Sequence, residues 1–262
     1  MELIRKAVDV DRVCQALGHR VFEACGATFV RDTELPDIHE GNHVARVRVE
    51  TRREIDALLE RAEAEYAHCR HRQFRLDPET PPTFEARLVA MGYEASASLV
   101  MVLEGTLGGR APDHPIRPIE TDADWVEYAR LKRLDWREVC ARHALGDLPE
   151  VGEGLIHTHR GRVPPLRYWF VLVDGTPRGF FSSWEGPAGV GQIEDLFVEE
   201  PFRHRGLATA LIHHTVADCR AHGAGSIAIV ADTTDTPKAM YAAMGFRPVA
   251  VVRKYTRRVD AT

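Results

Sequence analysis

Hydrophobic positions in the second part of the chain change their spacing several times, from a helical period to short apolar runs. The helical period is clear over 121–144, where Thr121 is a suitable N-cap and the large apolar side chains are Trp125, Tyr128, Leu131, Leu134 and Val139. Residues 167–186 form two apolar runs around Asp174-Gly175, a dipeptide typical of a tight turn. The spacing therefore predicts a helix followed by a hairpin.

Further along, apolar strands alternate with helical segments. We predict strands over 116–120, 191–200, 226–232 and 247–258, and helices over 205–223 and 236–246. Gly223 is a suitable C-cap for the first of these two helices. Strands that alternate with helices in this way indicate the α/β class, with a mixed sheet flanked by helices.

The first part of the chain repeats part of this pattern. We predict a helix over 51–69 and a strand over 72–76, followed by a second helix and a strand over 95–105. The stretch 76–94 resembles 231–247, since each has Asp, then Thr-Pro, then a helix that closes in Ala-Met-Gly-aromatic. We interpret this as an internal duplication of the last half of the unit, with chance similarity as the alternative.

A stretch rich in glycine and proline separates the two parts. Residues 105–115 hold three glycines and two prolines, a composition typical of a linker. The expected organisation is therefore a partial, degenerate domain over 1–104, a linker over 105–115 and a complete domain over 116–262.

Composition and charge narrow the classes of protein. The formal net charge is −5, which argues against a dedicated nucleic-acid binder. No run of about 18 apolar residues predicts a membrane span, and the N-terminal residues show no apolar signal core. The five cysteines form no CxxC pair, so we expect reduced thiols and no metal site. A cytoplasmic protein is expected.

The motif Arg203-x-x-Gly206-x-Ala208 stands between a predicted strand and a predicted helix. The first amides of a helix have no intrahelical acceptor, and the helix dipole favours an anion there. Small residues at 206 and 208 allow phosphate oxygens to approach the backbone, and Arg203 and Arg205 add charged contacts. This pattern favours an anion site, with a solvated basic helix start as the alternative.

Followed by Tyr241-x-x-x-Gly245-Phe246, this motif resembles the GNAT superfamily of acyl-CoA-dependent N-acetyltransferases over residues 116–258. The resemblance implies a GNAT-like, splayed mixed sheet and acetyl-CoA as co-substrate, without a metal. It also implies that the backbone of Leu196, Phe197 and Val198 pairs with the pantetheine arm. The amides that would hold the pyrophosphate are those of His204, Arg205, Gly206, Leu207, Ala208 and Thr209.

Acyl transfer to an amine needs a group that takes a proton from the acceptor and a group that protonates the departing thiolate. The resemblance implies Glu194 as the base and Tyr241 as the acid, with a β-bulge near Leu196 that presents an amide to the thioester carbonyl. Asp195 competes with Glu194, because a bulge can exchange the faces of a strand. Leu88 replaces the tyrosine in the first copy, which we expect to be catalytically silent.

Two histidines and a threonine are weaker candidates for functional residues. His157 and His159 lie in a stretch over 152–166 that we expect to be a loop rich in glycine and proline, without a third metal ligand. Thr234 stands where the family often has asparagine, and its hydroxyl is expected to cap the helix or contact the cofactor.

Together these features predict an N-acyltransferase that moves an acetyl group from acetyl-CoA to a primary amine of a small molecule, by direct attack in a ternary complex. The alternative is a sensor or regulatory module that binds coenzyme A without turnover. No nucleic-acid or membrane partner is expected. A homodimer is compatible with the sequence, which does not determine the oligomeric state.

Overall fold

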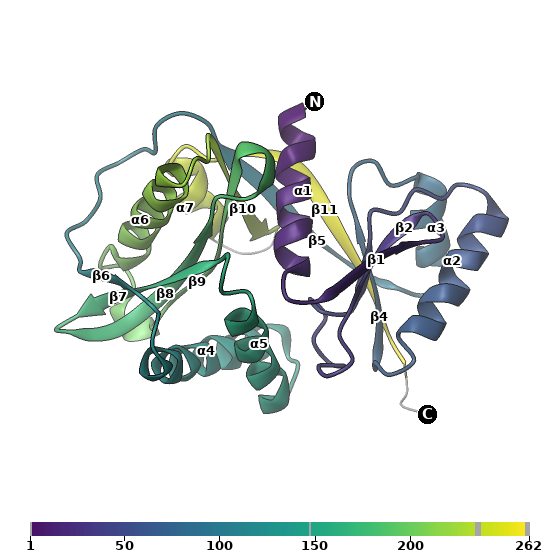
Figure 1. Cartoon of the computed structure of the whole chain (residues 1–262), viewed down its shortest axis with the longest axis horizontal. Helices are drawn as coiled ribbons and strands as arrows, with labels where there is room; N and C mark the ends of the chain where they lie inside the picture. Colours follow the sequence, from purple (N-terminus) through teal and green to yellow (C-terminus); the bar gives the residue numbers. More distant parts are fainter. Residues whose placement is uncertain (1, 147, 234–236, 260–262) are drawn as a thin grey trace. The chain divides into compact units, whose positions relative to one another are not determined.

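The computed structural model describes residues 2–146, 148–233 and 237–259 (Figure 1). The helices are α1 (Glu2–Ala16), α2 (Arg52–Glu65), α3 (Pro82–Ala90), α4 (Asp122–His143), α5 (Pro149–Gly161), α6 (Leu207–Ala221) and α7 (Pro237–Ala243). The strands are β1 (Arg20–Ala24), β2 (Ala27–Arg31), β3 (His43–Ala45), β4 (His71–Leu76), β5 (Glu94–Leu103), β6 (Ile116–Pro118), β7 (Arg167–Val173), β8 (Thr176–Trp184), β9 (Val190–Val198), β10 (Ser226–Asp232) and β11 (Arg247–Arg258). No helix in the described part combines the length and apolar character that crossing a membrane requires.

The chain forms two compact units whose sequences interleave. Unit 1 comprises residues 1–100, 230–238 and 248–262, and unit 2 comprises residues 101–229 and 239–247. This division differs from the expected continuous domains, because the last strand belongs to the same unit as the N-terminal residues.

The strands of unit 1 follow the order β1-β2-β3-β4-β11-β5. Alternation along β4 sends Phe74 to one face, where it packs against Phe84 of α3 in a core shared with α2. The next residue, Arg75, donates to buried Asp11 of α1 at 2.8 Å on the other face. Helices therefore cover both faces of this sheet.

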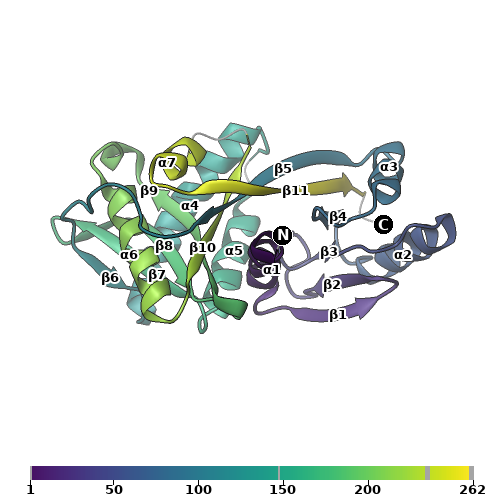
Figure 2. The same ribbon diagram turned by 90° about the horizontal axis from the view of Figure 1, so that it is seen from above.

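β11 completes unit 1 by pairing with β4. The two strands are antiparallel over Arg253–Arg258 and His71–Leu76, and Figure 2 shows β11 lying along β5 on its other side. All six residues of β4 are buried, so its backbone polar groups need partners on both edges. The C-terminal strand supplies one of these edges.

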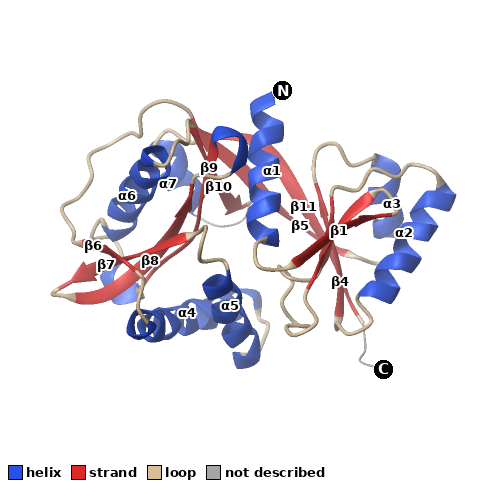
Figure 3. Ribbon diagram, in the orientation of Figure 1, coloured by secondary structure: helices blue, strands red, loops and turns tan. Residues whose placement is uncertain are grey.

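The strands of unit 2 follow the order β10-β9-β8-β7-β6, and Figure 3 shows α4 and α5 on the opposite side of these strands from α6. The predicted hairpin is confirmed, with left-handed Asp174 and Gly175 between β7 and β8. Thr121 caps α4 as expected. The parallel pairing of β9 with β10 covers 190–193, and β9 then continues to Val198, so the sheet splays as expected of this fold.

The two stretches that resemble each other end in the same backbone geometry. The Tyr93 amide donates to the Leu88 carbonyl after α3, and the Phe246 amide donates to the Tyr241 carbonyl after α7, at 3.1 and 3.0 Å. In both, the glycine that precedes the aromatic residue is left-handed. This is the Schellman arrangement, and the shared sequence pattern therefore has a structural counterpart.

Candidate active site

β9 carries a bulge where its pairing with β8 shifts. Ser182 of β8 pairs with Glu194, and Phe180 pairs with Phe197. The single residue of β8 between them therefore faces two residues of β9, Asp195 and Leu196. Asp195 has a φ of 66°, in the left-handed region that non-glycine residues rarely adopt. The bulge expected around Leu196 is confirmed, and such a bulge leaves a residue outside the regular ladder.

Two neighbouring carboxylates of β9 both contact the layer formed by α4 and α5. The Oε1 atom of Glu194 lies 3.3 Å from Nη1 of Arg162, the residue that follows α5. The Oδ1 atom of Asp195 lies 2.5 Å from Nζ of Lys132 on α4. Strict alternation would send these side chains to opposite faces, and the left-handed residue at the bulge removes that separation.

Asp195 is part of a buried polar network. Lys132 Nζ also lies 2.8 Å from Asp135. The Tyr128 hydroxyl donates to Asp195 Oδ2 at 2.7 Å, and His159 Nδ1 lies 2.6 Å from the same hydroxyl and 3.2 Å from that carboxylate. Because the hydroxyl hydrogen is directed at Asp195, His159 Nδ1 has to donate to the hydroxyl oxygen. The network ties the bulge to both α4 and α5.

Burial and charge act against each other in this network. Burial is the largest effect on Asp195 and on Lys132, and it disfavours the charged form of each. The nearby charges of Lys132 and His159 nevertheless lower the pKa of Asp195 below its ordinary value. Asp135 and Asp195 correspondingly raise the pKa of Lys132. Burial also raises the pKa of Tyr128 well above its ordinary value. Asp195 is therefore ionised at neutral pH and has little tendency to accept a proton.

The two arginines of the loop after β9 have different surroundings. Arg203 donates to the Val198 carbonyl at 3.0 Å and pairs with Glu138 of α4 at 2.5 Å. Its guanidinium therefore connects the loop to the end of β9 and to α4. Arg205 is exposed and lies over the Phe202 ring at 5.2 Å. Of the two, Arg205 is the one without a carboxylate in contact among the described residues.

Two left-handed residues shape the backbone of this loop. His204 and Gly206 are both left-handed, with φ of 61° and 84°. The first backbone hydrogen bond of α6 runs from the Ala210 amide to the Gly206 carbonyl at 2.9 Å. The amides of residues 207–209 therefore have no acceptor within the helix, and the helix dipole adds partial positive charge at the same place.

A pocket of about 240 Å³ opens at this end of α6. The loop and the first turn of the helix form most of its wall, with Val198 from β9 and Met240 from α7. Residues 207–209, whose amides have no acceptor within the helix, are among the residues that line it.

Part of the expected linker contacts the loop. His114 Nε2 lies 2.9 Å from the Arg205 carbonyl oxygen. A Cβ atom on Gly206 would stand 3.0 Å from Pro112 Cγ, closer than side chains tolerate. Glycine at 206 is therefore required both by its left-handed backbone and by this contact, and residues 105–115 support the loop.

Tyr241 lies on α7, and 5% of its surface is exposed. Its ring has an edge-to-face contact with Phe246, with centroids 6.2 Å apart. Leu88, the corresponding residue of the first copy, is fully buried. Thr234, expected to contact the cofactor, lies outside the described residues.

The expectation of a loop over 152–166 is wrong, because α5 occupies Pro149–Gly161. Proline at its first turn is compatible with a helix start, and Gly152 is packed so tightly on Trp136 that a Cβ would come within 3.0 Å of its ring. His159 is buried on this helix. Within the described residues, no group of three or more His, Cys, Asp or Glu side chains is arranged to hold a metal ion.

Sequence reasoning missed three members of the buried network. The helical period places Tyr128 in the hydrophobic stripe of its helix, and no local pattern assigns Lys132 or His159 to the site. The available signal was the spacing of Tyr128 and Lys132, four residues apart on one helix face, where a lysine follows the apolar stripe.

A comparison with family models gives one match, to the acetyltransferase (GNAT) family over residues 123–246. This range contains the bulge of β9, the left-handed loop and Tyr241. No curated protein matches the sequence.

Solved structures resemble the fold over most of the chain. A conserved protein of unknown function from Staphylococcus epidermidis has a TM-score of 0.70 and 13% identity, with 92% of this chain and 95% of that chain covered. A GCN5-related N-acetyltransferase from Kribbella flavida has a TM-score of 0.68 and 17% identity, with 95% of each chain covered.

A tandem GNAT protein from the clavulanic acid biosynthesis pathway has a TM-score of 0.59 and 17% identity, with 84% of this chain and 76% of that chain covered. At these identities the likeness concerns the fold. Members of the matched family are generally acyltransferases that use acetyl-CoA. We conclude that residues 123–246 belong to the acetyltransferase (GNAT) family, within a fold that resembles GNAT proteins over most of the chain.

Proposed function

We propose that the protein transfers an acetyl group from acetyl-CoA to a primary amine of a small molecule, by direct attack in a ternary complex. One observation carries this proposal: the bulge at Asp195 and Leu196 and the free amides of α6 belong to a single strand-loop-helix segment. A thioester and the pyrophosphate of the same cofactor can be bound along such a segment.

The amides from His204 to Thr209 are proposed to hold the pyrophosphate. The two left-handed residues and the three helical amides support this assignment, as does the pocket at that place. Arg205 is free to add a charged contact, whereas Arg203 acts through its bond to Val198. Backbone groups of residues 196–198 are proposed to pair with the pantetheine arm where β9 splays from β10.

Glu194 is proposed as the general base and Asp195 as a positioning residue. Asp195 accepts from Tyr128 and Lys132, and its lowered pKa makes it a poor proton acceptor at neutral pH. Held in this way, it keeps the bulge in its left-handed conformation, so that the Leu196 amide is available to the thioester carbonyl oxygen.

The proposed reaction balances with these groups. Glu194 takes a proton from the acceptor ammonium, and the free amine forms a bond to the thioester carbonyl carbon. The carbon–sulfur bond breaks as Tyr241 donates its hydroxyl proton to the departing thiolate. The nitrogen, which is positively charged after the attack, releases its second proton, and this proton restores the Tyr241 hydroxyl through solvent, while Glu194 returns its own proton to water. The products are the N-acetylated amine and coenzyme A.

The test is a screen for thiol release from acetyl-CoA in the presence of amines, amino acids, aminoglycosides and peptides. Turnover with at least one acceptor, lost in Glu194→Gln, would support the proposal. Tight binding of coenzyme A with no thiol release for any acceptor would favour the sensor alternative. Absence of coenzyme A binding would contradict both.

A further inference from the structure

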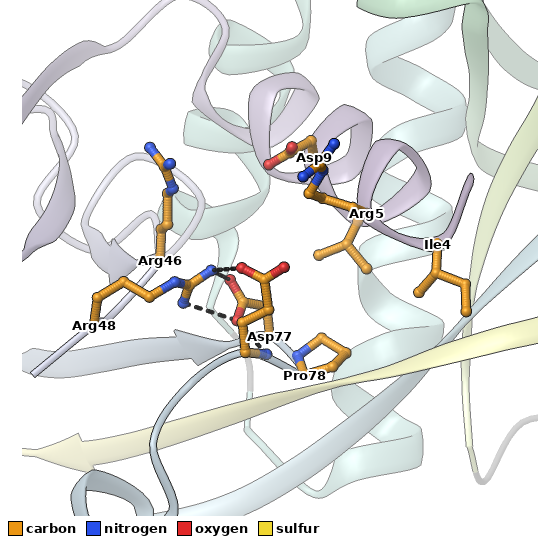
Figure 4. Close-up of a pocket in the computed structure, with 9 residues that line it drawn as sticks. Ile4, Arg5, Asp9, Arg46, Arg48, Asp77 and Pro78 are labelled. Carbon is orange, nitrogen blue, oxygen red and sulfur yellow. Dashed lines mark hydrogen bonds and ion pairs between the residues drawn. The ribbon is translucent and has the colours of Figure 1, made fainter. Parts of the chain in front are cut away.

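A second pocket, of about 210 Å³, lies in unit 1 (Figure 4). It is formed by the residues that follow β3, those that follow β4, and the first turns of α1. Pockets for drug-sized ligands are larger, roughly 300 Å³ and above, so this one suits a small metabolite and excludes an entire cofactor.

The pocket has the same place in the chain topology as the coenzyme A site proposed for unit 2. β3 and β4 are parallel neighbours connected through α2, as β9 and β10 are connected through α6. The anion-binding groups differ, however. Thr51 caps α2, and the Glu54 carboxylate accepts from the amides of Thr51 and Glu50 at 3.0 and 3.4 Å. The amides of Glu50, Thr51 and Glu54 thus already have side-chain acceptors within the chain.

Side chains of both signs line the pocket instead. Arg48 is neutralised by two bonds to Asp77, at 3.0 and 2.8 Å, and by one to Glu79 at 2.9 Å (Figure 4). These bonds connect the segment after β3 with the segment after β4. They leave Arg48 little capacity for a ligand.

Two other arginines of the lining are differently placed. In the described part of the chain, no ion pair involves Arg5 or Arg46. Arg46 is exposed and left-handed, with a φ of 49°, a costly conformation for a residue with a side chain and one that is frequent at binding sites. In Figure 4, Arg46 lies across the pocket from Arg5 and Asp9 of α1.

The acidic counterpart is Asp9. Its Oδ1 atom is 3.3 Å from Arg12, a long contact at a partly exposed site. Such a pair contributes little, so the carboxylate can accept from a ligand ammonium. The remaining wall is apolar, formed by Ile4, Val8 and Pro78.

We propose that this pocket binds a small zwitterion, an α-amino acid with an apolar side chain. Arg46, supported by Arg5, would receive the carboxylate, Asp9 the ammonium group, and the wall of Ile4, Val8 and Pro78 the side chain. Three arginines and three acidic residues line the pocket, so a ligand with balanced charges fits better than a phosphate or a polyamine. The proposal does not depend on acetyl transfer in unit 2.

The test is calorimetry on the full chain at low ionic strength with three probes that share the same isobutyl group. L-leucine carries both charges, 4-methylpentanoate lacks the ammonium group, and isoamylamine lacks the carboxylate. We expect leucine to bind with one site per chain and each of the other probes to bind about tenfold more weakly or worse, since each loses a charged hydrogen bond.

Leucine binding by variants tests whether the proposed residues form the site. Arg46→Met and Asp9→Asn should each weaken leucine binding about tenfold, and Arg53→Met, which alters an exposed arginine of α2, should leave it unchanged. Circular dichroism checks that each variant is folded. The proposal is overturned if leucine does not bind, if both pocket variants bind it like the wild type, or if 4-methylpentanoate binds equally well.

Discussion

Tyr241 and Leu88 occupy the same position in two copies of one local structure. Each lies one turn before a left-handed glycine, and each carbonyl accepts from the aromatic residue that follows. Both side chains are buried, so packing alone does not require a hydroxyl at this position. At this position the second copy has a side chain that can donate a proton, and the first copy does not.

Replacement of Tyr241 by phenylalanine should therefore reduce kcat by about 100-fold while the affinity for coenzyme A stays the same, because a general acid acts in the transition state. Steady-state kinetics and calorimetry measure the two quantities. Tyr255→Phe is the matched control, since its hydroxyl bonds Glu85 in unit 1. An unchanged kcat with chemistry rate-limiting would show that Tyr241 is not the acid.

Lys132 has a structural role that its exposed neighbour lacks. It is buried between Asp195 and Asp135, whereas Arg133 pairs with Glu153 at the surface. We expect Lys132→Met to lower the free energy of unfolding by about 3–5 kcal/mol, because it leaves buried carboxylates uncompensated. Arg133→Met should cost about 1 kcal/mol or less. Denaturant unfolding measures both, and equal losses would contradict this account.

The same network predicts how stability depends on pH. The pKa of Asp195 is lowered on folding, so its contribution is present above the ordinary value and lost as the pH falls below it. The pKa of Lys132 is raised, so its contribution is present below the ordinary value and lost as the pH rises above it. The stability difference between wild type and Lys132→Met should therefore be largest near neutral pH. It should narrow as the pH falls toward the range in which carboxylates are protonated and as it rises above about pH 10.

At the scale of elements, α2 and α6 show two uses of a helix N-terminus. α2 satisfies its first amides with its own capping box, and α6 starts at a left-handed glycine that offers no side-chain acceptor. A capped helix end is stable by itself, whereas an uncapped one keeps its amides for a ligand.

A carboxylate introduced into the first turn of α6 should separate the stability of this helix end from its capacity to bind an anion. Ala208→Glu places a negative charge where the helix dipole favours it, so the fold should keep its stability or gain about 0.3–1 kcal/mol. The same charge should repel the pyrophosphate and weaken coenzyme A binding about tenfold or more.

Ala217→Glu, on the exposed side of the same helix, is the control for this experiment. Thermal unfolding and calorimetry measure stability and affinity. If Ala208→Glu bound coenzyme A as tightly as Ala217→Glu, the pyrophosphate would not be held at this end of α6.

At the scale of the whole molecule, the end of the chain is a structural part of the unit in which the chain begins. β11 pairs with β4 over six residues of each strand. The buried strand β4 has only a short parallel pairing with β3 on its other edge. Unit 1 therefore depends on residues that lie far along the chain from its first hundred residues.

Truncation before Pro248 should expose this dependence. We expect the amides of His71–Leu76 to exchange hydrogen about tenfold faster or more, because their antiparallel partner is lost. Hydrogen exchange measured by mass spectrometry resolves this segment, and the β7–β8 hairpin of unit 2 is the internal reference. Unchanged exchange in β4 would indicate that residues 1–104 fold without β11.

The sequence alone determined much of unit 2. The period of its apolar residues placed α4, α6 and the hairpin, because these elements bury one face and have distinct local signals at their ends. The motif from Arg203 to Ala208 and the tyrosine before Gly245 indicated the family, since both are short and local. The sequence pattern does not predict α5, because a stretch with several glycines has the composition of a loop, although one of them, Gly152, makes a close contact with Trp136.

Tertiary structure decided what depends on partners distant in the chain. The pairing of β11 with β4 joins residues nearly two hundred positions apart, and no local pattern specifies which strands β11 pairs with. The low pKa of Asp195 likewise results from Lys132 and His159, brought to it by two different helices. Local spacing determines which element forms, whereas the free energy of a buried charge depends on the groups that the completed fold places around it.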